Sequence, residues 1–198
     1  MGATVIFLAT IAVSLLGLYG PSGLIDRAML RPYWLRRKHQ YDRLLTSGFV
    51  HADIPHLLFN MMTFYFFAFA MERYVGTARF LLLYFSGLLF SNAGSAVKHK
   101  DDPNYATLGA SGAILAVMFA SIVYSPYQKI LILPIPVPIP APLFAVLYLM
   151  YSYYASKHSR GRINHDAHFA GALVGLAFVA VTDPAAYEQL AGMLGLGN

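Results

Sequence analysis

The stretch Gly109-Ala110-Ser111-Gly112 leads into an apolar run from Ala113 to Val123, and the rest of the chain is interpreted around it. A serine between two glycines at the start of an apolar helix places a hydroxyl group where another backbone can approach closely. In membrane helices a small-Ser-small pattern usually marks helix packing. The pattern indicates chemistry only if other polar residues are placed to meet Ser111.

Composition indicates a membrane protein with one domain over residues 1–198. The chain is 58% hydrophobic and 12% charged, against about 25% charged residues in soluble domains. Residues 4–17 have the length of a signal-peptide core, but no basic residue precedes them and no cleavage pattern follows, so we expect a retained span. The absence of cysteine excludes disulfides, thiolate metal ligands and a cysteine nucleophile. The net charge of +5 lies in loops, which favours membrane topology and no nucleic-acid partner.

Long apolar runs predict an all-α polytopic membrane protein, a bundle of six transmembrane helices. The expected spans are residues 4–18, 55–74, 78–97, 111–124, 142–155 and 166–181. The fourth is well short of the ~20 residues that a straight lipid-facing span needs, so we expect it at the centre of the bundle. A short central helix leaves room for water above its end, which hydrolysis inside a membrane requires.

Two connections have distinctive compositions. The long first loop, residues 21–54, mixes Trp34 and tyrosines with six basic residues, which suits a segment at the lipid headgroups; a plain hydrophilic loop is the alternative. In residues 134–142 every second residue is proline. This alternation predicts an extended polyproline-type spacer, with a gate or docking strip as the alternative.

The order of the spans predicts that a set of polar residues lies on the same side of the membrane. The second, fourth and sixth spans cross the bilayer in the same direction, so their N-terminal ends share one side. His56 and Asn60 lie near the start of the second, Ser111 opens the fourth, and His168 lies in the first turn of the sixth. At about 1.5 Å per residue, all four reach a similar depth.

These residue types suit acyl transfer. A serine hydroxyl needs a base within hydrogen-bond reach, which His168 could supply. The developing oxyanion needs donors, and the backbone N–H of Ser111 with the side chains of His56 and Asn60 could provide them. No carboxylate is placed to orient His168, since Asp166 points elsewhere on the helix, so a Ser–His dyad is expected.

Five spaced elements in order make the chain resemble the rhomboid intramembrane serine proteases over about residues 43–181. The elements are His51-x4-His56-x3-Asn60, Glu72-x3-Gly76, Gly109-x-Ser111-Gly112, His168-x2-Gly171 and the following x3-Gly175. The resemblance implies that Ser111 is the nucleophile, that His168 is the base, and that His56, Asn60 and the Ser111 amide form the oxyanion hole.

The resemblance also implies supporting roles. Arg43 corresponds to the arginine of a Trp-Arg pair in the family, although Asp42 precedes it here, and His51 to a structural histidine. One turn after the serine, where the family often has an aromatic that stacks on the catalytic histidine, this chain has Leu115. Packing against the imidazole is therefore expected to be aliphatic.

The expected function is an intramembrane serine endopeptidase that cleaves the transmembrane segments of single-span membrane proteins within the lipid bilayer. The fifth span is the expected route of substrate entry, and no cofactor or metal is expected. An inactive rhomboid-like scaffold that binds membrane helices is the alternative, because it would use the same fold. A transporter is disfavoured, because the spans carry almost no charge away from their ends. Oligomeric state is left open.

The charge of the loops and the resemblance to the rhomboid family predict opposite orientations of the protein in the membrane. Eleven of the 14 basic residues fall on the catalytic side, which would place that side in the cytoplasm by the positive-inside rule. The resemblance to bacterial rhomboid proteases instead implies that the catalytic side lies outside the cytoplasm. We follow the family and expect a bacterial inner-membrane protein whose site opens to the extracytoplasmic side.

Overall fold

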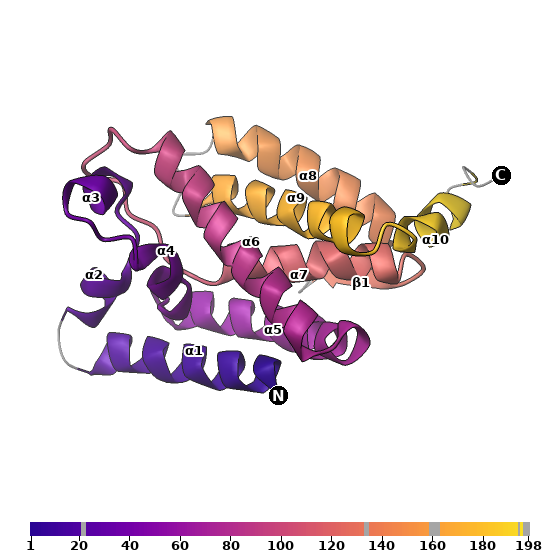
Figure 1. The fold of residues 1–198 in the computed structure, drawn as a ribbon, viewed down its shortest axis with the longest axis horizontal. Coiled ribbons are helices and arrows are strands. Elements are labelled where there is room, and N and C mark those ends of the chain that lie inside the picture. The colour runs from indigo at the N-terminus through magenta and orange to yellow at the C-terminus, as the bar shows by residue number, and fades with distance from the viewer. Residues whose placement is uncertain (21–22, 133–134, 159–162, 194, 196–198) are drawn as a thin grey trace.

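The computed structural model describes residues 1–20, 23–132, 135–158, 163–193 and 195. Six longer helices correspond to the six expected spans, and their ends agree with the predictions to within three residues: α1 (Gly2–Tyr19), α5 (Ile54–Val75), α6 (Thr77–Lys98), α7 (Ser111–Tyr124), α8 (Ala141–His158) and α9 (His165–Thr182). Successive helices run in opposite directions, so α5, α7 and α9 all begin at the same end of the bundle (Figure 1).

Four of these helices are long and apolar enough to cross a membrane: α1, α5, α6 and α9. The apolar α7 has only 14 residues. Although α8 has 18 residues, four of them are tyrosines and its last turn carries Lys157 and His158, which lowers its hydropathy. The chain is therefore an all-α polytopic membrane protein, with α7 as the expected short helix.

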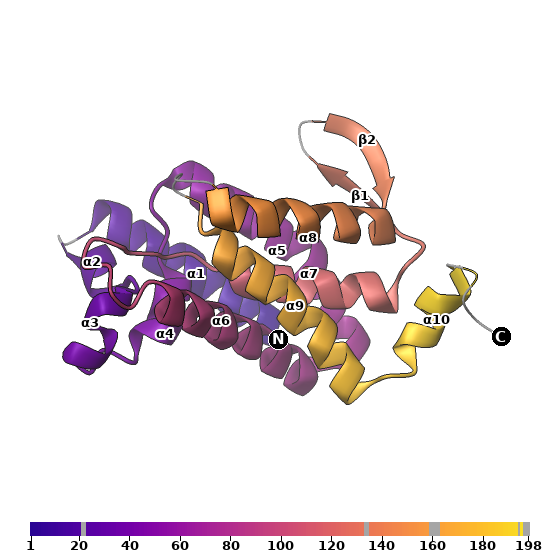
Figure 2. The same ribbon diagram turned by 90° about the horizontal axis from the view of Figure 1, so that it is seen from above.

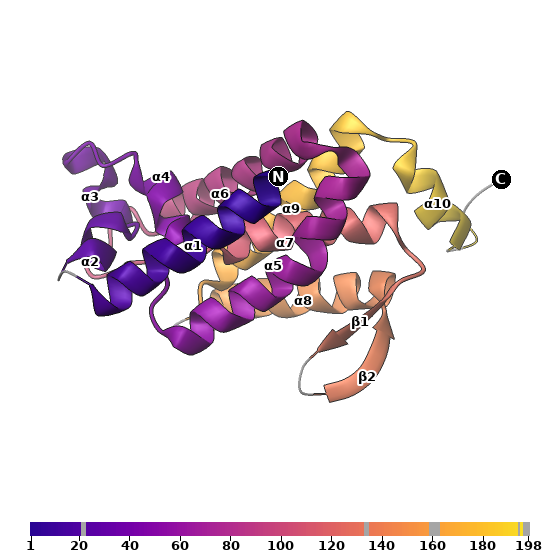
Figure 3. The same ribbon diagram turned by 90° about the horizontal axis from the view of Figure 1, so that it is seen from below.

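The short helix α7 lies at the centre of the bundle. All of its residues except Ser111 and Ser121 are buried, and it packs against α5, α6, α8 and α9. In Figure 1, α8 lies above it and α1 below, and Figure 3 shows α1 between α5 and α6 on the side opposite α8. A helix enclosed in this way has no need of the full bilayer-spanning length.

Glycines allow α9 to approach α7 at backbone contact. A Cβ on Gly171 would overlap the carbonyl of Gly112, and a Cβ on Gly175 would overlap the carbonyl of Ala116. On the other side of α7, a Cβ on Gly87 of α6 would lie 2.5 Å from that of Ala116. The small-residue pattern of the sequence thus serves close helix packing, and it fixes the depth of α9 relative to α7.

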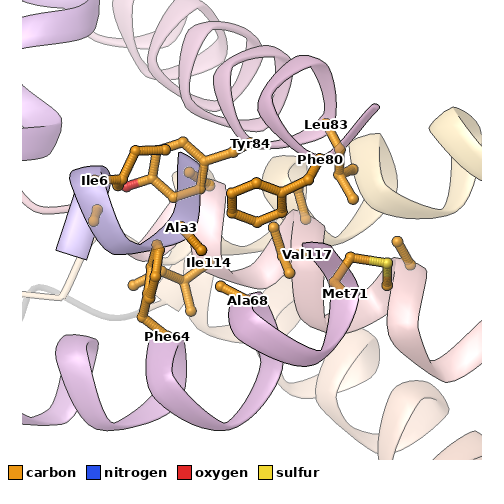
Figure 4. Packing of buried hydrophobic residues seen from close by; sticks show 14 of the residues in the cluster. Ala3, Ile6, Phe64, Ala68, Met71, Phe80, Leu83, Tyr84, Ile114 and Val117 are labelled. Carbon is orange, nitrogen blue, oxygen red and sulfur yellow. The ribbon is translucent and has the colours of Figure 1, made fainter. Parts of the chain in front are cut away.

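The main core fills the space among α1, α5, α6 and α7. Phe64, Phe80 and Tyr84 are the largest side chains of this cluster, and they meet edge-on or tilted with ring centroids 5.7–6.4 Å apart. Figure 4 shows these rings against Ile114 and Val117 of α7. Rigid aromatic packing of this kind holds α7, and with it Ser111, in place.

The first loop is structured, from residue 23 onward, as three short helices, α2 (Leu24–Ala28), α3 (Pro32–Arg37) and α4 (Arg43–Thr46), and a 3-10 helix, Ser47–Phe49. It is hydrogen-bonded to the segment that precedes α7. Leu30 and Thr107 exchange two backbone hydrogen bonds of 2.9 Å, and the N–H of Gly109 donates to the carbonyl of Ser47 at 2.8 Å. The loop therefore braces the chain that leads into Ser111.

Residues 135–140 are extended, as predicted for the proline-rich segment 134–142, but they form a hydrogen-bonded strand and not a polyproline-type rod. Strand β2 (Ile135–Pro140) pairs antiparallel with β1 (Lys129–Ile132), and the hairpin projects from the bundle beside α8 (Figure 2). Alternate prolines place every missing N–H on one edge of a strand, so the other edge keeps its donors for pairing. Pro142 falls in the first turn of α8, whereas Pro134, like the loop cations Arg160 and Arg162, lies outside the described residues.

A further helix, α10 (Ala186–Met193), follows α9 and was not predicted. The hydroxyl of Tyr187 donates to the carbonyl of Leu176 at 2.8 Å and holds α10 against the bundle. At the same end of the molecule, Glu72 of α5 accepts hydrogen bonds from the backbone of Gly2 and Ala3 and from the hydroxyl of Thr77. This carboxylate satisfies the otherwise unpaired amides at the start of α1.

Candidate active site

Ser111 and His168 are in hydrogen-bond contact. The Oγ of Ser111, the first residue of α7, lies 2.8 Å from Nε2 of His168, in the first turn of α9. The start of α9 is fixed by Asn164, whose side-chain oxygen accepts from the N–H of Ala167 at 3.0 Å. The amide of Asn164 donates to the hydroxyls of Ser95 and Thr107, which ties this helix start to α6 and to the loop before Ser111.

The second ring nitrogen of His168 has a partner that the sequence analysis missed. The hydroxyl of Tyr148, on α8, lies 3.2 Å from Nδ1. Both nitrogens of the imidazole are therefore bonded, one to Ser111 on α7 and the other to Tyr148 on α8. The sequence predicts a dyad alone, because no carboxylate is placed to contact His168 and a tyrosine in the middle of an aromatic-rich helix gives no signal of such a contact.

His56 packs against the loop that leads into Ser111. Gly109 has φ of +111°, a conformation that favours glycine, and a Cβ at this position would lie 2.8–2.9 Å from the His56 ring. The rings of His56 and His51 meet edge-on, 4.9 Å apart. The two histidines and Gly109 thus form one wall beside the nucleophile candidate.

His51 is a buried structural residue. Its Nδ1 lies 2.9 Å from the hydroxyl of Ser14 on α1, and the ring has no exposed surface. Burial lowers the pKa of His51 to about 3; the neighbouring His56 adds to the lowering and Asp53 opposes it. The ring is therefore neutral at physiological pH and holds α1 against the start of α5.

Ser111, His56 and Asn60 carry hydrogen-bond donors that an oxyanion could use. The N–H groups of the first turn of α7 have no partner within the helix, and Ala110, which precedes Ser111, provides no side-chain cap. Asn60, buried one turn after His56, donates one amide hydrogen to the carbonyl of His56 at 3.0 Å, which leaves its second amide hydrogen for another acceptor. This arrangement suits a developing negative charge on a substrate oxygen.

Asp166 belongs to a polar cluster with Lys98 and His99, separate from Ser111 and His168. It accepts from Lys98 at 2.6 Å and from His99 at 3.1 Å, and Lys98 also donates to the carbonyl of Ser156 at the end of α8. His99 stacks on Tyr105 with ring centroids 3.7 Å apart. Burial raises the pKa of Tyr105 to about 12, and Asp166 adds to this rise. The expectation that Asp166 does not orient His168 agrees with these contacts.

The remaining predicted residues divide between the site and other regions. Gly112, Gly171 and Gly175 form the close contact of α7 with α9, and buried Leu115 lies in the apolar cluster to which Tyr148 packs. Glu72 lies 16 residues after His56 on one helix, about 24 Å along its axis, so it stabilises the opposite end. Arg43 lines a cavity of the first loop together with Trp34. Among the described residues, no group of three or more His, Asp or Glu side chains could hold a metal ion.

The chain is similar to proteins of one family. Residues 38–184 match the family described as Rhomboid domain. The chain is 44% identical over 78 residues to "Putative rhomboid protease YdcA" of Bacillus subtilis (39% of this chain, 38% of the relative). It is 30% identical over 149 residues to "RHOMBOID-like protein 12, mitochondrial" of Arabidopsis thaliana (66% and 43%), and 29% identical over 146 residues to "Rhomboid protease GlpG" of Yersinia enterocolitica (72% and 50%). The matches span only 38–50% of the length of these relatives.

Proposed function

The chain belongs to the rhomboid family, and from that membership and the contact of Ser111 with His168 we propose that it is an intramembrane serine endopeptidase. The single observation that carries the proposal is the 2.8 Å separation of Ser111 Oγ and His168 Nε2, on residues 57 apart in the chain. Relatives named as proteases support a protease function. As its location we propose a bacterial inner membrane, with the site opening to the extracytoplasmic side.

In the proposed reaction Ser111 is the nucleophile and His168 the general base. The hydroxyl of Ser111 donates to Nε2, so Nε2 is the unprotonated nitrogen and Nδ1 carries the hydrogen. When Oγ attacks the scissile carbonyl carbon, its proton moves to Nε2. The imidazolium then gives this proton to the leaving amine, which departs as the first product and leaves an acyl-enzyme ester on Ser111.

Tyr148 is the proposed positioning residue for His168. In the tautomer that the reaction requires, the N–H at Nδ1 donates to the Tyr148 oxygen, so this hydrogen bond both selects the tautomer and fixes the plane of the ring. It becomes charge-assisted when His168 takes up the proton of Ser111, so it is stronger in the transition state than in the ground state. Tyr148 thereby takes the place of the carboxylate that the sequence lacks.

The tetrahedral oxyanion is proposed to be held by the N–H of Ser111 at the α7 N-terminus and by His56 and Asn60 of α5. The helix N-terminus adds a favourable dipole for negative charge. Water then attacks the ester with His168 as base, which releases the second product and restores the Ser111 hydroxyl. Ser111 is only partly buried, which is consistent with access of water to this end of α7.

We propose the transmembrane segments of single-span membrane proteins as substrates. A helix hides its carbonyl groups in internal hydrogen bonds, so the segment must unwind near Ser111 before attack. The proposed entry route is α8, because it packs mainly on α9 and has many exposed apolar side chains, among them Val146 and Met150.

The test is cleavage of a generic single-span substrate in detergent by the wild type and by two variants, Ser111→Ala and His168→Ala. Wild type should release both fragments, and each variant should fall to background. Equal cleavage by all three would contradict the Ser–His assignment. Binding of the substrate without cleavage by the wild type would favour the alternative, a scaffold that binds membrane helices.

A further inference from the structure

A cavity of about 290 Å³ opens in the first loop, among α2, α3 and the start of α4. Its lining residues are Asp26, Arg31, Trp34, Lys38, Gln40 and Arg43. Drug-sized ligands occupy pockets of roughly 300–1,000 Å³, so this volume suits a small polar group. The proposed peptidase chemistry uses none of these six residues.

The lining carries uncompensated positive charge. It contains three cations and one carboxylate. Among the residues that the structure describes, Arg31 is the one cation of this lining that forms a salt bridge, with Asp26 at 2.9 Å. Across the described parts of the chain, no carboxylate oxygen lies within 4.0 Å of Lys38 or Arg43. Asp26 offsets only Arg31, so Lys38 and Arg43 leave the cavity with an excess of positive charge that attracts a negatively charged ligand.

The cavity also offers an exposed acceptor. The carboxylate of Asp26 lines it, and this side chain keeps 70% of its surface exposed beside Arg31. A carboxylate has two oxygens and can accept further hydrogen bonds from a ligand. The fitting ligand therefore combines an anionic group with a hydroxyl or ammonium group a few ångströms away.

The surroundings of the cavity are those of a membrane interface. The Nζ of Lys38 lies 4.3 Å from the centroid of the Trp34 ring, and the guanidinium of Arg37 lies 3.8 Å from that of Tyr33. Aromatic rings interleaved with Lys and Arg are typical of the headgroup region of bilayers. Helices α2–α4 lie at the end of the bundle where α5, α7 and α9 begin (Figures 1 and 3).

We propose that this cavity binds a phosphate ester that carries a hydrogen-bond donor, the chemistry of a glycerophospholipid headgroup such as phosphatidylglycerol. The guanidinium of Arg43 binds the phosphate oxygens, with Lys38 as the second cation. A hydroxyl group of the headgroup donates to the carboxylate of Asp26. Free phosphate shares the anionic oxygens but lacks the glycerol hydroxyl groups of the headgroup.

Occupation of the cavity would stabilise the chain next to Ser111. Arg31 follows Leu30, which is bonded to Thr107, and the helix that Arg43 begins is followed directly by Ser47, whose carbonyl accepts from Gly109. The hydroxyl of Thr46 donates to the carbonyl of Ala28 and closes the first loop on itself. A ligand that bridges α2, α3 and α4 would therefore make the loop and the segment before Ser111 unfold together at a higher temperature.

The test is thermal unfolding of the full chain in detergent with short-chain phosphatidylglycerol, short-chain phosphatidylcholine or inorganic phosphate. At a hundredfold excess over Kd, mass action predicts that phosphatidylglycerol raises Tm by roughly 5–10 °C. Phosphatidylcholine, whose headgroup has no hydrogen-bond donor, should raise it less. If inorganic phosphate alone gives the full shift in Tm, with the same dependence on the variants below, then the cavity binds phosphate. Its ligand is in that case free phosphate and not a lipid headgroup.

Three variants separate the cavity from general surface charge. Arg43→Gln and Lys38→Gln should abolish the shift, whereas Arg36→Gln, which removes an exposed cation of α3 that does not line the cavity, should retain it. Lys38 is exposed, so its variant tests the site even if Arg43→Gln fails to fold. An equal shift in all three variants, or no shift in the wild type, would overturn the proposal. This test measures thermal stability, so its result does not depend on whether the protein cleaves a substrate.

Discussion

Nδ1 of His168 and the hydroxyl of Tyr148 lie 3.2 Å apart on two different helices, α9 and α8. The imidazole is thus held from both sides, although no carboxylate contacts it among the described residues. Since α8 is also the proposed entry route, any displacement of α8 that admits substrate also moves the partner of the base.

Tyr148→Phe should lower kcat by roughly 10- to 100-fold and leave KM nearly unchanged, because a charge-assisted hydrogen bond contributes about 1.5–3 kcal/mol to the transition state. Steady-state cleavage of a single-span substrate measures both constants. Tyr154→Phe, at an exposed position of the same helix, is the control and should match the wild type. A rise in KM alone would assign Tyr148 to substrate binding.

His56→Ala and Asn60→Ala should each lower kcat by about 10²–10³-fold, the usual effect of removing one oxyanion donor. The N–H of Ser111 remains in both variants, so activity should stay above that of Ser111→Ala. Thr63→Ala, one turn further along α5, should retain full activity. If either donor variant is as inactive as Ser111→Ala, the division of roles among the donors is wrong.

Gly171→Ala should destabilise the protein and abolish cleavage, because the new Cβ would overlap the carbonyl of Gly112 and push α9 away from Ser111. Overpacking of this kind destabilises by about 1–3 kcal/mol, and backbone has little room to adjust. Gly94→Ala is the matched control, since its Cβ would lie 3.8 Å from that of Ala170, an ordinary contact. Thermal unfolding and cleavage assays of both variants measure the difference.

Acid should destabilise the protein through His51. The native state keeps this ring neutral down to its pKa of about 3, whereas the unfolded chain takes up the proton near pH 6.5, so stability falls as pH drops below about 6.5. Between pH 7 and pH 5 this single group accounts for about 2 kcal/mol, or roughly 4–8 °C in Tm. His51→Asn should flatten the dependence of Tm on pH, and His158→Asn, at an exposed position, should not. Parallel curves for wild type and His51→Asn would contradict this assignment.

The sequence predicts the positions of the helices, because hydrophobic runs define helix ends. It also predicts that Ser111 and His168 lie at a similar depth, because helices separated by an even number of crossings run in the same direction. Tyr148 could not be found in this way. It lies in the middle of a helix that runs the other way, and the depth of α8 relative to α9 is set by packing. The cavity of the first loop depends on how three short helices fold over each other, which residue spacing does not determine.

The hairpin was missed for a different reason. Prolines at every second residue of 134–142 favour an extended rod without internal hydrogen bonds. They nevertheless leave the N–H groups of Val137 and Ile139 on the opposite edge of the strand, where they can pair with β1. The alternation of proline with β-branched residues, next to the apolar segment 130–132, was the available signal.

Labelling with a fluorophosphonate, followed by peptide mapping with mass spectrometry, tests the central claim most directly. An activated serine reacts with this reagent, whereas ordinary hydroxyl groups do not. The wild type should carry the adduct on Ser111, and labelling should vanish in Ser111→Ala and fall to near background in His168→Ala. An adduct on another serine, or equal labelling of Ser111 with and without His168, would contradict the account.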